Sequence, residues 1–194
     1  MSDYLQPAFY RFNQDSLELV RWIRTRVGAA SSILDLGAGC GVIGIELARA
    51  FAPRDLVLVE AQEAFGEFLR KNLDLFLGPG TRGEVELRRF SAFTPSTRFE
   101  LIACNPPYYL RGNGQESRDP RRGIARSFVL DGWPELAGCI DRSLGPTGRA
   151  YLVLKNERRI TDTALAALGG FSVRTEVVGA TLLIELSRLH EDRG

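Results

Sequence analysis

Short aliphatic runs alternate with segments of helical hydrophobic spacing along most of the chain. Apolar runs of this length, bounded by turn residues, are typical of buried strands, whereas apolar residues three or four positions apart are typical of amphipathic helices. The runs predict strands over 33–36, 56–59, 85–87, 101–104 and 151–154. The helical spacing predicts helices over 42–51, 65–76, 134–144 and 160–168, preceded by a helical pattern from Leu17 to Ile23.

The carboxyl-terminal part of the chain adds a hairpin to this alternating pattern. Residues 171–178 and 181–186 are two strand-like runs with only Gly179-Ala180 between them, which is the spacing of a β-hairpin. Strands that alternate with helices imply a parallel sheet covered by helices on both faces. We therefore expect an α/β fold, a doubly wound, mostly parallel seven-stranded sheet that ends in an antiparallel hairpin.

Length and composition favour a single domain. The chain has 194 residues, of which 44% are hydrophobic, and this is enough for one sizeable core. It contains no internal repeat and no convincing linker. We therefore expect one domain, with a helical amino-terminal segment over 1–30 and an α/β core over 31–194.

Charge and cysteine usage exclude several classes of protein. The net charge is only +1, so the surface as a whole does not have the strongly basic character of a nucleic-acid-binding protein. No apolar run reaches the roughly 18 residues of a membrane span, and the first residues lack the features of a secretory signal. Cys40, Cys104 and Cys139 form neither a zinc-type pair nor a disulfide framework. We expect a cytoplasmic protein that holds no metal.

A glycine-rich loop follows the first expected strand. Its sequence is Asp35-Leu36-Gly37-Ala38-Gly39-Cys40-Gly41, and Glu60 stands where the second strand ends. In doubly wound sheets ligands bind at the carboxyl ends of the strands, and glycines let a ligand approach the backbone amides. A carboxylate at the position of Glu60 can accept hydrogen bonds from both hydroxyls of a ribose.

Three interpretations of this loop are open. The loop could be only a tight turn. It could be a dinucleotide site, since Gly39 to Gly44 matches G-x-G-x-x-G, or it could be a site for S-adenosyl-L-methionine. An acid two residues before the first of three alternating glycines favours the last of these. The amino-acid end of that cofactor is a zwitterion, and Asp35 can hold it directly or through water.

The fourth expected strand ends in Asn105-Pro106-Pro107-Tyr108, at the same edge of the sheet as the glycine loop. The lone pair of an amide or aromatic amine is delocalised, so the nitrogen is a poor nucleophile. Two acceptors for its N–H bonds, the Asn105 side-chain oxygen and the Pro106 carbonyl, would aim the lone pair at a methyl group. Prolines stiffen the segment, and Tyr108 offers a flat face for a base or amide. The alternative interpretation is a rigid turn after a strand.

A long polar loop, roughly 111–126, follows this tetrapeptide and is rich in arginine. Arginine side chains at this place could hold the phosphates that flank an unstacked base. The alternative is a solvated loop whose arginines only reflect composition. Its arginines are Arg111, Arg118, Arg121, Arg122 and Arg126.

These motifs together resemble those of the class I methyltransferases that modify amino groups, which carry the tetrapeptide as Asn-Pro-Pro-Tyr. Within that class the chain is similar to the bacterial tRNA(Val) adenine N6-methyltransferases. The narrower resemblance rests on Phe12-Asn13-Gln14-Asp15 ahead of the first helix, on Asn105 to Tyr109, and on Arg126 and Leu130-Asp131. It covers most of the chain, and its arginine loop and amino-terminal segment are less specific than the tetrapeptide and the glycine loop.

The resemblance implies S-adenosyl-L-methionine as cofactor and a role for each matching residue. Asp35, Gly37, Gly39 and Gly41 would hold the methionine part, and Glu60 the ribose. Gln14 and Asp15 would close over the cofactor, or they only cap the first helix. Where the family often has an acid for the adenine amine, this chain has Ser91-Ala92, so Ser91 or a backbone group must substitute. The residues expected at the target are Asn105, Pro106, Pro107 and Tyr108, with Tyr109, Arg111, Arg121, Arg122 and Arg126 on RNA.

The sequence thus favours an N-methyltransferase that acts on adenine N6 in RNA, with a tRNA as partner. A glutamine methyltransferase of the release-factor type uses the same tetrapeptide but usually carries an extra amino-terminal helical domain. The first expected strand begins at residue 33, which leaves little room for one. Two weaker hypotheses stay open, namely a methyltransferase fold without activity that only binds RNA, and a dehydrogenase.

Overall fold

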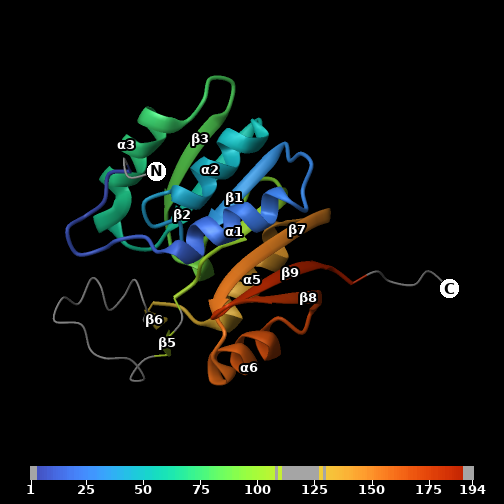
Figure 1. The fold of residues 1–194 in the computed structure, drawn as a ribbon. Coiled ribbons are helices and arrows are strands. Elements are labelled where there is room, and N and C mark those ends of the chain that lie inside the picture. Colours follow the sequence, from blue (N-terminus) through green and yellow to red (C-terminus); the bar gives the residue numbers. More distant parts are fainter. Residues whose placement is uncertain (1–3, 108, 111–126, 129, 190–194) are drawn as a thin grey trace.

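The structure is a computed structural model and describes residues 4–107, 109–110, 127–128 and 130–189. Of residues 109–110 and 127–128 it describes the backbone. The protein is built around one seven-stranded sheet with helices on both of its faces (Figure 1).

The sheet has the strand order β3-β2-β1-β4-β7-β9-β8. Five neighbouring strands pair in parallel, and β9 pairs antiparallel with both β7 and β8. The hairpin strand β9 therefore lies between β7 and the edge strand β8, and the expected seven-stranded, mostly parallel sheet is confirmed. The strands are β1 (Ser32–Leu36), β2 (Asp55–Glu60), β3 (Arg82–Leu87), β4 (Phe99–Cys104), β7 (Leu144–Lys155), β8 (Phe171–Val178) and β9 (Thr181–Arg188).

The helices divide between the two faces of the sheet (Figure 1). One face carries α1 (Gln14–Arg24), α2 (Val42–Phe51) and α3 (Gly66–Phe76). The other carries α5 (Trp133–Ser143) and α6 (Arg158–Ala167). Two short 3-10 turns, η1 (Glu63–Phe65) and η2 (Phe90–Ala92), follow β2 and β3, and the two-residue strands β5 (Tyr109–Leu110) and β6 (Ser127–Phe128) pair in parallel.

Strand β7 begins earlier than its apolar run indicates. The run starts at Tyr151, but the strand starts at Leu144 and includes Gly145 and Pro146, residues that are typical of turns. The pairing with β4 shifts register between Phe99 and Leu101, and such an irregularity accommodates residues that a regular ladder would not. A side chain at Gly148 would lie 2.6 Å from the Phe99 carbonyl oxygen, so this close approach requires glycine.

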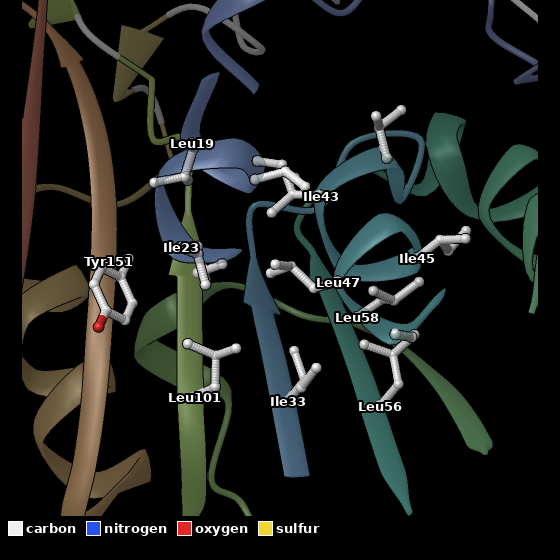
Figure 2. Close-up of a cluster of buried hydrophobic side chains, with 14 of the residues drawn as sticks. Leu19, Ile23, Ile33, Ile43, Ile45, Leu47, Leu56, Leu58, Leu101 and Tyr151 are labelled. Carbon is white, nitrogen blue, oxygen red and sulfur yellow. The ribbon is translucent and has the colours of Figure 1, made fainter. Parts of the chain in front are cut away.

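The core follows the alternation of side chains along each strand. In β4, Leu101 and Ala103 belong to the cluster under α1, α2 and α3, whereas Ile102 and Cys104 belong to the cluster under α5 and α6. Figure 2 shows the first cluster, in which side chains of α1 and α2 lie over apolar side chains of β1, β2, β4 and β7. Leu19 and Ile23 of α1 are fully buried there.

Candidate active site

Three polar residues come together where parallel strands end on the face covered by α1, α2 and α3. In the sheet, Leu36 of β1 lies between Val59 of β2 and Cys104 of β4. Glu60 and Asn105 are the next residues along the chain from those two partners, so they flank the start of the glycine loop. Asp35 is the residue before Leu36, and its side chain accepts a hydrogen bond from Gly44 of α2. The structure thus brings together Asp35, Glu60 and Asn105, as the sequence predicts.

The glycine loop turns through three left-handed residues. Gly37, Gly39 and Gly41 have φ angles of 71°, 55° and 83°, a region in which a side chain is strained. The N–H groups of Gly37 and Ala38 both donate to the Val59 carbonyl at 2.9 Å, which ties the loop to β2. The turn delivers the chain into α2, whose first residue is Val42.

Asp35 is almost completely buried, with 1% of its surface exposed. Its Oδ2 accepts a hydrogen bond from the Gly44 N–H in the first turn of α2 at 2.8 Å, while its Oδ1 is buried without a hydrogen-bond partner. Burial raises the pKa of Asp35 to about 7, the Gly44 hydrogen bond lowers it, and the charge of Glu60 raises it further. Asp35 is therefore a buried carboxyl group that has one oxygen, Oδ1, without a hydrogen-bond partner.

The close approach of α2 to Asp35 depends on Gly44. A Cβ at Gly44 would lie 2.5 Å from Leu58 and 3.0 Å from the Cβ of Asp35. This glycine is the last of the G-x-G-x-x-G match, and here it lets helix and sheet pack closely. The packing itself does not distinguish a dinucleotide from S-adenosyl-L-methionine.

Glu60 anchors the glycine loop from the neighbouring strand. Its Oε2 accepts a hydrogen bond from the Gly39 N–H at 2.9 Å, and its Oε1 accepts one from the Gln62 N–H at 2.8 Å. Burial raises the pKa of Glu60, and these backbone hydrogen bonds lower it. A carboxylate oxygen has two lone pairs, so each oxygen can accept a further hydrogen bond.

Asn105 reaches across to the start of α1. Its Nδ2 donates to Ser16 Oγ at 3.0 Å and to Asn13 Oδ1 at 3.4 Å. Pro106 is buried and Pro107 is half-buried. Tyr108 lies outside the described residues.

Gln14 and Asp15 are the first two residues of α1, and the cap position belongs to Asn13. The Asn13 Nδ2 donates to Asp15 Oδ2 at 2.6 Å. Gln14 is exposed and Asp15 is half-buried. Both lie in the helix turn that meets Asn105, so their place in the fold is beside the site.

Tyr10 covers the glycine loop, and no sequence motif indicates it. The Tyr10 ring lies 3.8 Å from where a Cβ of Gly39 would stand, and it packs edge-on against Phe65 at 5.2 Å between ring centres. The segment before α1 thus forms part of the site's surroundings. This segment is neither helix nor strand, so its sequence has no hydrophobic periodicity. The aromatic residues between positions 4 and 12 are the only signal in its sequence that it is buried.

Asn72 of α3 joins this amino-terminal segment to the glycine loop. It is fully buried. Its amide exchanges hydrogen bonds with the backbone of Leu5 at 2.9 and 3.0 Å, and its Nδ2 also donates to the Cys40 carbonyl at 2.9 Å. A polar residue within an apolar helical stripe is the signal that could have indicated this bracing contact.

The carboxylate of Asp131 lies beside Ser91, the position after β3 where an acid for the cofactor's adenine is expected. The exposed Ser91 Oγ donates to Asp131 Oδ1 at 2.8 Å. Ala92 is exposed next to it, and a Cβ on Gly37 would lie 3.6 Å from the Phe90 ring. Asp131, which the sequence marks only as a point of resemblance, therefore stands where the third strand lacks an acid.

The arginines of the long polar loop and one of its neighbouring tyrosines have different standing in the structure. Arg111, Arg118, Arg121, Arg122 and Arg126 lie outside the described residues. Tyr109 belongs to β5, which pairs with Ser127 and Phe128 of β6. The short strands that flank the arginine-rich loop in the sequence therefore lie side by side.

Within the described ranges, no three or more metal-ligating side chains gather into a cluster. None of the described helices is long and apolar enough to cross a bilayer. All three cysteines are free and buried, and burial raises the pKa of each thiol. They are unsuited to be nucleophiles.

The strand order, the glycine loop and the acid after β2 define the class of protein, the S-adenosyl-L-methionine-dependent methyltransferases of class I. The comparisons with known proteins agree. The chain belongs to the methyltransferase small domain family, whose model matches residues 11–129. The cofactor that this family implies is S-adenosyl-L-methionine.

Curated relatives carry a more specific name. A tRNA1(Val) (adenine(37)-N6)-methyltransferase from Tolumonas auensis is 30% identical over 81% of this chain and 64% of its own length. A protein of the same name from Aeromonas hydrophila is 33% identical over 72% of this chain and 57% of its own length. The chain thus spans less than two thirds of the length of these relatives.

Solved structures support the fold. A 16S rRNA methyltransferase from T. thermophilus, in complex with AdoMet and guanosine, matches 92% of this chain and 44% of its own with a TM-score of 0.68 at 22% identity. A ribosomal protein L11 methylase from Lactobacillus delbrueckii matches 92% of this chain and 81% of its own with a TM-score of 0.66 at 15% identity. At these identities the likeness shows the fold alone.

Proposed function

We propose that the protein is an N-methyltransferase that acts on an exocyclic amine, the N6 of adenine in an RNA of the tRNA type. The observation that carries the proposal is the position of Asn105, directly after β4 and beside the edge that holds Asp35 and Glu60. The name of the curated relatives, tRNA1(Val) (adenine(37)-N6)-methyltransferase, supplies the choice of adenine and tRNA.

The residues at this edge fit the parts of S-adenosyl-L-methionine. The unused Oδ1 of Asp35 is an acceptor for the cofactor's amino group, and the left-handed glycines 37, 39 and 41 keep the loop free of side chains. Glu60 can accept hydrogen bonds from the ribose while it holds the Gly39 N–H. Ser91 and Asp131 would face the adenine, where a carboxylate is the natural acceptor for an exocyclic amine.

The chain's own residues then account for the reaction at nitrogen. The bound cofactor supplies an electrophilic methyl group. Asn105 Oδ1 and the Pro106 carbonyl accept the two N–H bonds of the target amine, so its lone pair is aimed at that methyl group. No strong base is needed, because the nitrogen becomes acidic as the methyl group passes to it from sulfur. The nitrogen can then release its proton to water, and S-adenosylhomocysteine is the leaving group. The rate enhancement comes from positioning and from acceptors placed where positive charge develops.

The arginine-rich loop and two tyrosines complete the proposal. Tyr108 would stack on the flipped base, with Tyr109 beside it. Arg111, Arg121, Arg122 and Arg126 would bind flanking phosphates. An RNA substrate of this kind implies an enzyme of the cytoplasm, and three free, buried cysteines are in keeping with that compartment.

The test is a survey of methyl acceptors. The protein is incubated with labelled S-adenosyl-L-methionine and, separately, with unmodified total tRNA, ribosomal RNA and a release factor. We expect label in N6-methyladenosine of tRNA. Label in a glutamine of the release factor, with none in RNA, would replace the proposal by the glutamine methyltransferase alternative. Protein that binds RNA and cofactor but transfers no methyl group to any acceptor would point to an inactive RNA-binding subunit.

A further inference from the structure

The amide of Asn105 is held in one orientation by the first turn of α1. Its Nδ2 lies 3.0 Å from Ser16 Oγ and 3.4 Å from Asn13 Oδ1. The Ser16 partner is 89 residues away in sequence. Both acceptors sit on the same side of the amide, so the Asn105 nitrogen faces α1 and its oxygen is turned away from the helix.

This orientation matters because the two ends of an amide have opposite hydrogen-bonding character. In the proposed reaction Asn105 Oδ1 accepts an N–H of the target amine. A half-turn of the side chain would exchange oxygen and nitrogen and would point a donor at that N–H. Whatever fixes the nitrogen on α1 therefore fixes the acceptor toward the substrate.

The direction of the hydrogen bond between Asn105 and Asn13 follows from the orientation of the Asn13 amide. The Asn13 Nδ2 donates to Asp15 Oδ2 at 2.6 Å, so the nitrogen of the Asn13 amide is turned toward Asp15. The Oδ1 of Asn13 is then the atom that faces Asn105. The two amides are thus hydrogen-bonded in sequence, from Asn105 to Asn13 and from Asn13 to Asp15.

Of the two hydrogen bonds that Asn105 donates, the one to Ser16 is the stronger, because Ser16 is buried and rigidly placed. Only 4% of its surface is exposed, so water does not compete for the hydrogen bond from Asn105. Helix α1 is fixed on the sheet by Trp22, whose ring packs edge-on against Tyr151 at 5.4 Å and whose Nε1 donates to Glu176 Oε2 at 2.9 Å.

We propose that Ser16 is a positioning residue for methyl transfer, because its hydroxyl oxygen accepts the Asn105 Nδ2–H and holds that side chain in place. The Asn13 Oδ1, which can only accept, sets the direction of the amide and so turns the Asn105 oxygen toward the acceptor amine. The inference rests on the proposed function, which assigns that oxygen to the amine. It adds a residue that neither the sequence motifs nor the comparisons indicate, and it gives the amino-terminal helix a part in the chemistry.

The experiment compares Ser16→Ala and Ser16→Thr with wild type in single-turnover methylation of total tRNA at saturating S-adenosyl-L-methionine. Ser143→Ala is the matched control, since Ser143 is also fully buried but lies at the end of α5 on the opposite face. Ser16→Ala should lower the transfer rate at saturating tRNA by about 10- to 100-fold. Affinity for S-adenosylhomocysteine and the tRNA concentration at half-maximal rate should stay within about twofold of wild type, since those contacts remain. Ser16→Thr retains the oxygen and should keep most of the rate.

Three results would overturn this role. They are a wild-type rate in Ser16→Ala, an equal loss in Ser143→Ala, and an equal loss in Ser16→Thr. Asn105→Ala is measured in parallel. If Asn105→Ala loses activity while Ser16→Ala does not, only the positioning role fails. If Asn105→Ala keeps its activity, the proposed function fails with it.

Discussion

Replacing Glu60 tests where the cofactor binds. Glu60 lies at the end of β2 and accepts backbone hydrogen bonds from Gly39 and Gln62. We expect the same carboxylate to accept the ribose hydroxyls of S-adenosyl-L-methionine. Glu60→Gln keeps the size of the side chain but removes the charge and turns one acceptor into a donor. Glu60→Ala removes both acceptors.

The magnitude follows from the number of hydrogen bonds lost. A hydrogen bond to a charged group contributes about 1.5–3 kcal/mol. Loss of one such bond to the ribose should weaken binding of S-adenosylhomocysteine by about 10- to 150-fold, and loss of two by more. Glu60→Ala also releases the Gly39 N–H, so its effect should exceed that of Glu60→Gln.

Isothermal titration calorimetry with S-adenosylhomocysteine measures the effect, and a thermal melt checks that each variant folds. The matched control is Glu67→Ala, which removes an exposed carboxylate paired with Lys71 on α3 and should leave affinity unchanged. Titration with NAD tests the dinucleotide interpretation of the loop, which uses the same acid, and should give no binding because the chain belongs to a methyltransferase family. Unchanged affinity for S-adenosylhomocysteine in a folded Glu60→Ala variant would remove Glu60 from the site.

Three further predictions concern other parts of the site. Because burial raises the pKa of Asp35 to about 7, calorimetry should find that affinity for S-adenosylhomocysteine rises from about pH 6 to about pH 8 as the carboxyl group ionises, and that Asp35→Asn flattens this rise. Because the pKa of Asp35 is raised in the folded state, the folded protein binds more protons than the unfolded chain between about pH 4 and pH 7. The melting temperature should therefore fall as pH rises through that window, and it should fall by less in Asp35→Asn. Asp131→Asn should weaken the binding of S-adenosylhomocysteine by about 10-fold, and Ser91→Ala should weaken it less. Equal affinity of wild type and Asp131→Asn for this ligand would contradict a contact between Asp131 and the adenine. Arg121→Ala with Arg122→Ala should weaken tRNA binding and reduce its salt dependence by roughly one unit of slope per lost phosphate contact, and an unchanged salt slope in filter binding contradicts the RNA role.

Much of the fold was predictable because the elements have strong periodic patterns. The predicted and observed bounds of α2, Val42–Phe51, coincide, since a glycine precedes the apolar stripe and Pro53 follows it. The meeting of Asp35, Glu60 and Asn105 was also predictable, because the carboxyl ends of neighbouring parallel strands lie at one edge of the sheet. Their roles toward the cofactor and the amine stay predictions.

The contacts that join distant segments could not be predicted in the same way. Ser16 meets Asn105, and Asp131 meets Ser91, across 89 and 40 residues of sequence. Each contact depends on how a helix end or a loop docks on the sheet, and no local spacing specifies that docking. The start of β7 was missed for a related reason, because Gly145 and Pro146 indicate a turn until a shifted register accommodates them.

In the proposed function, Asn105 orients an acceptor amine beside the bound cofactor. The most direct measurement is the single-turnover rate of methyl transfer to total tRNA in Asn105→Ala, together with its affinity for S-adenosylhomocysteine. We predict a rate lower by on the order of 100-fold or more, with affinity within about twofold of wild type. A near-normal rate of N6-methyladenosine formation in this variant would contradict the claim.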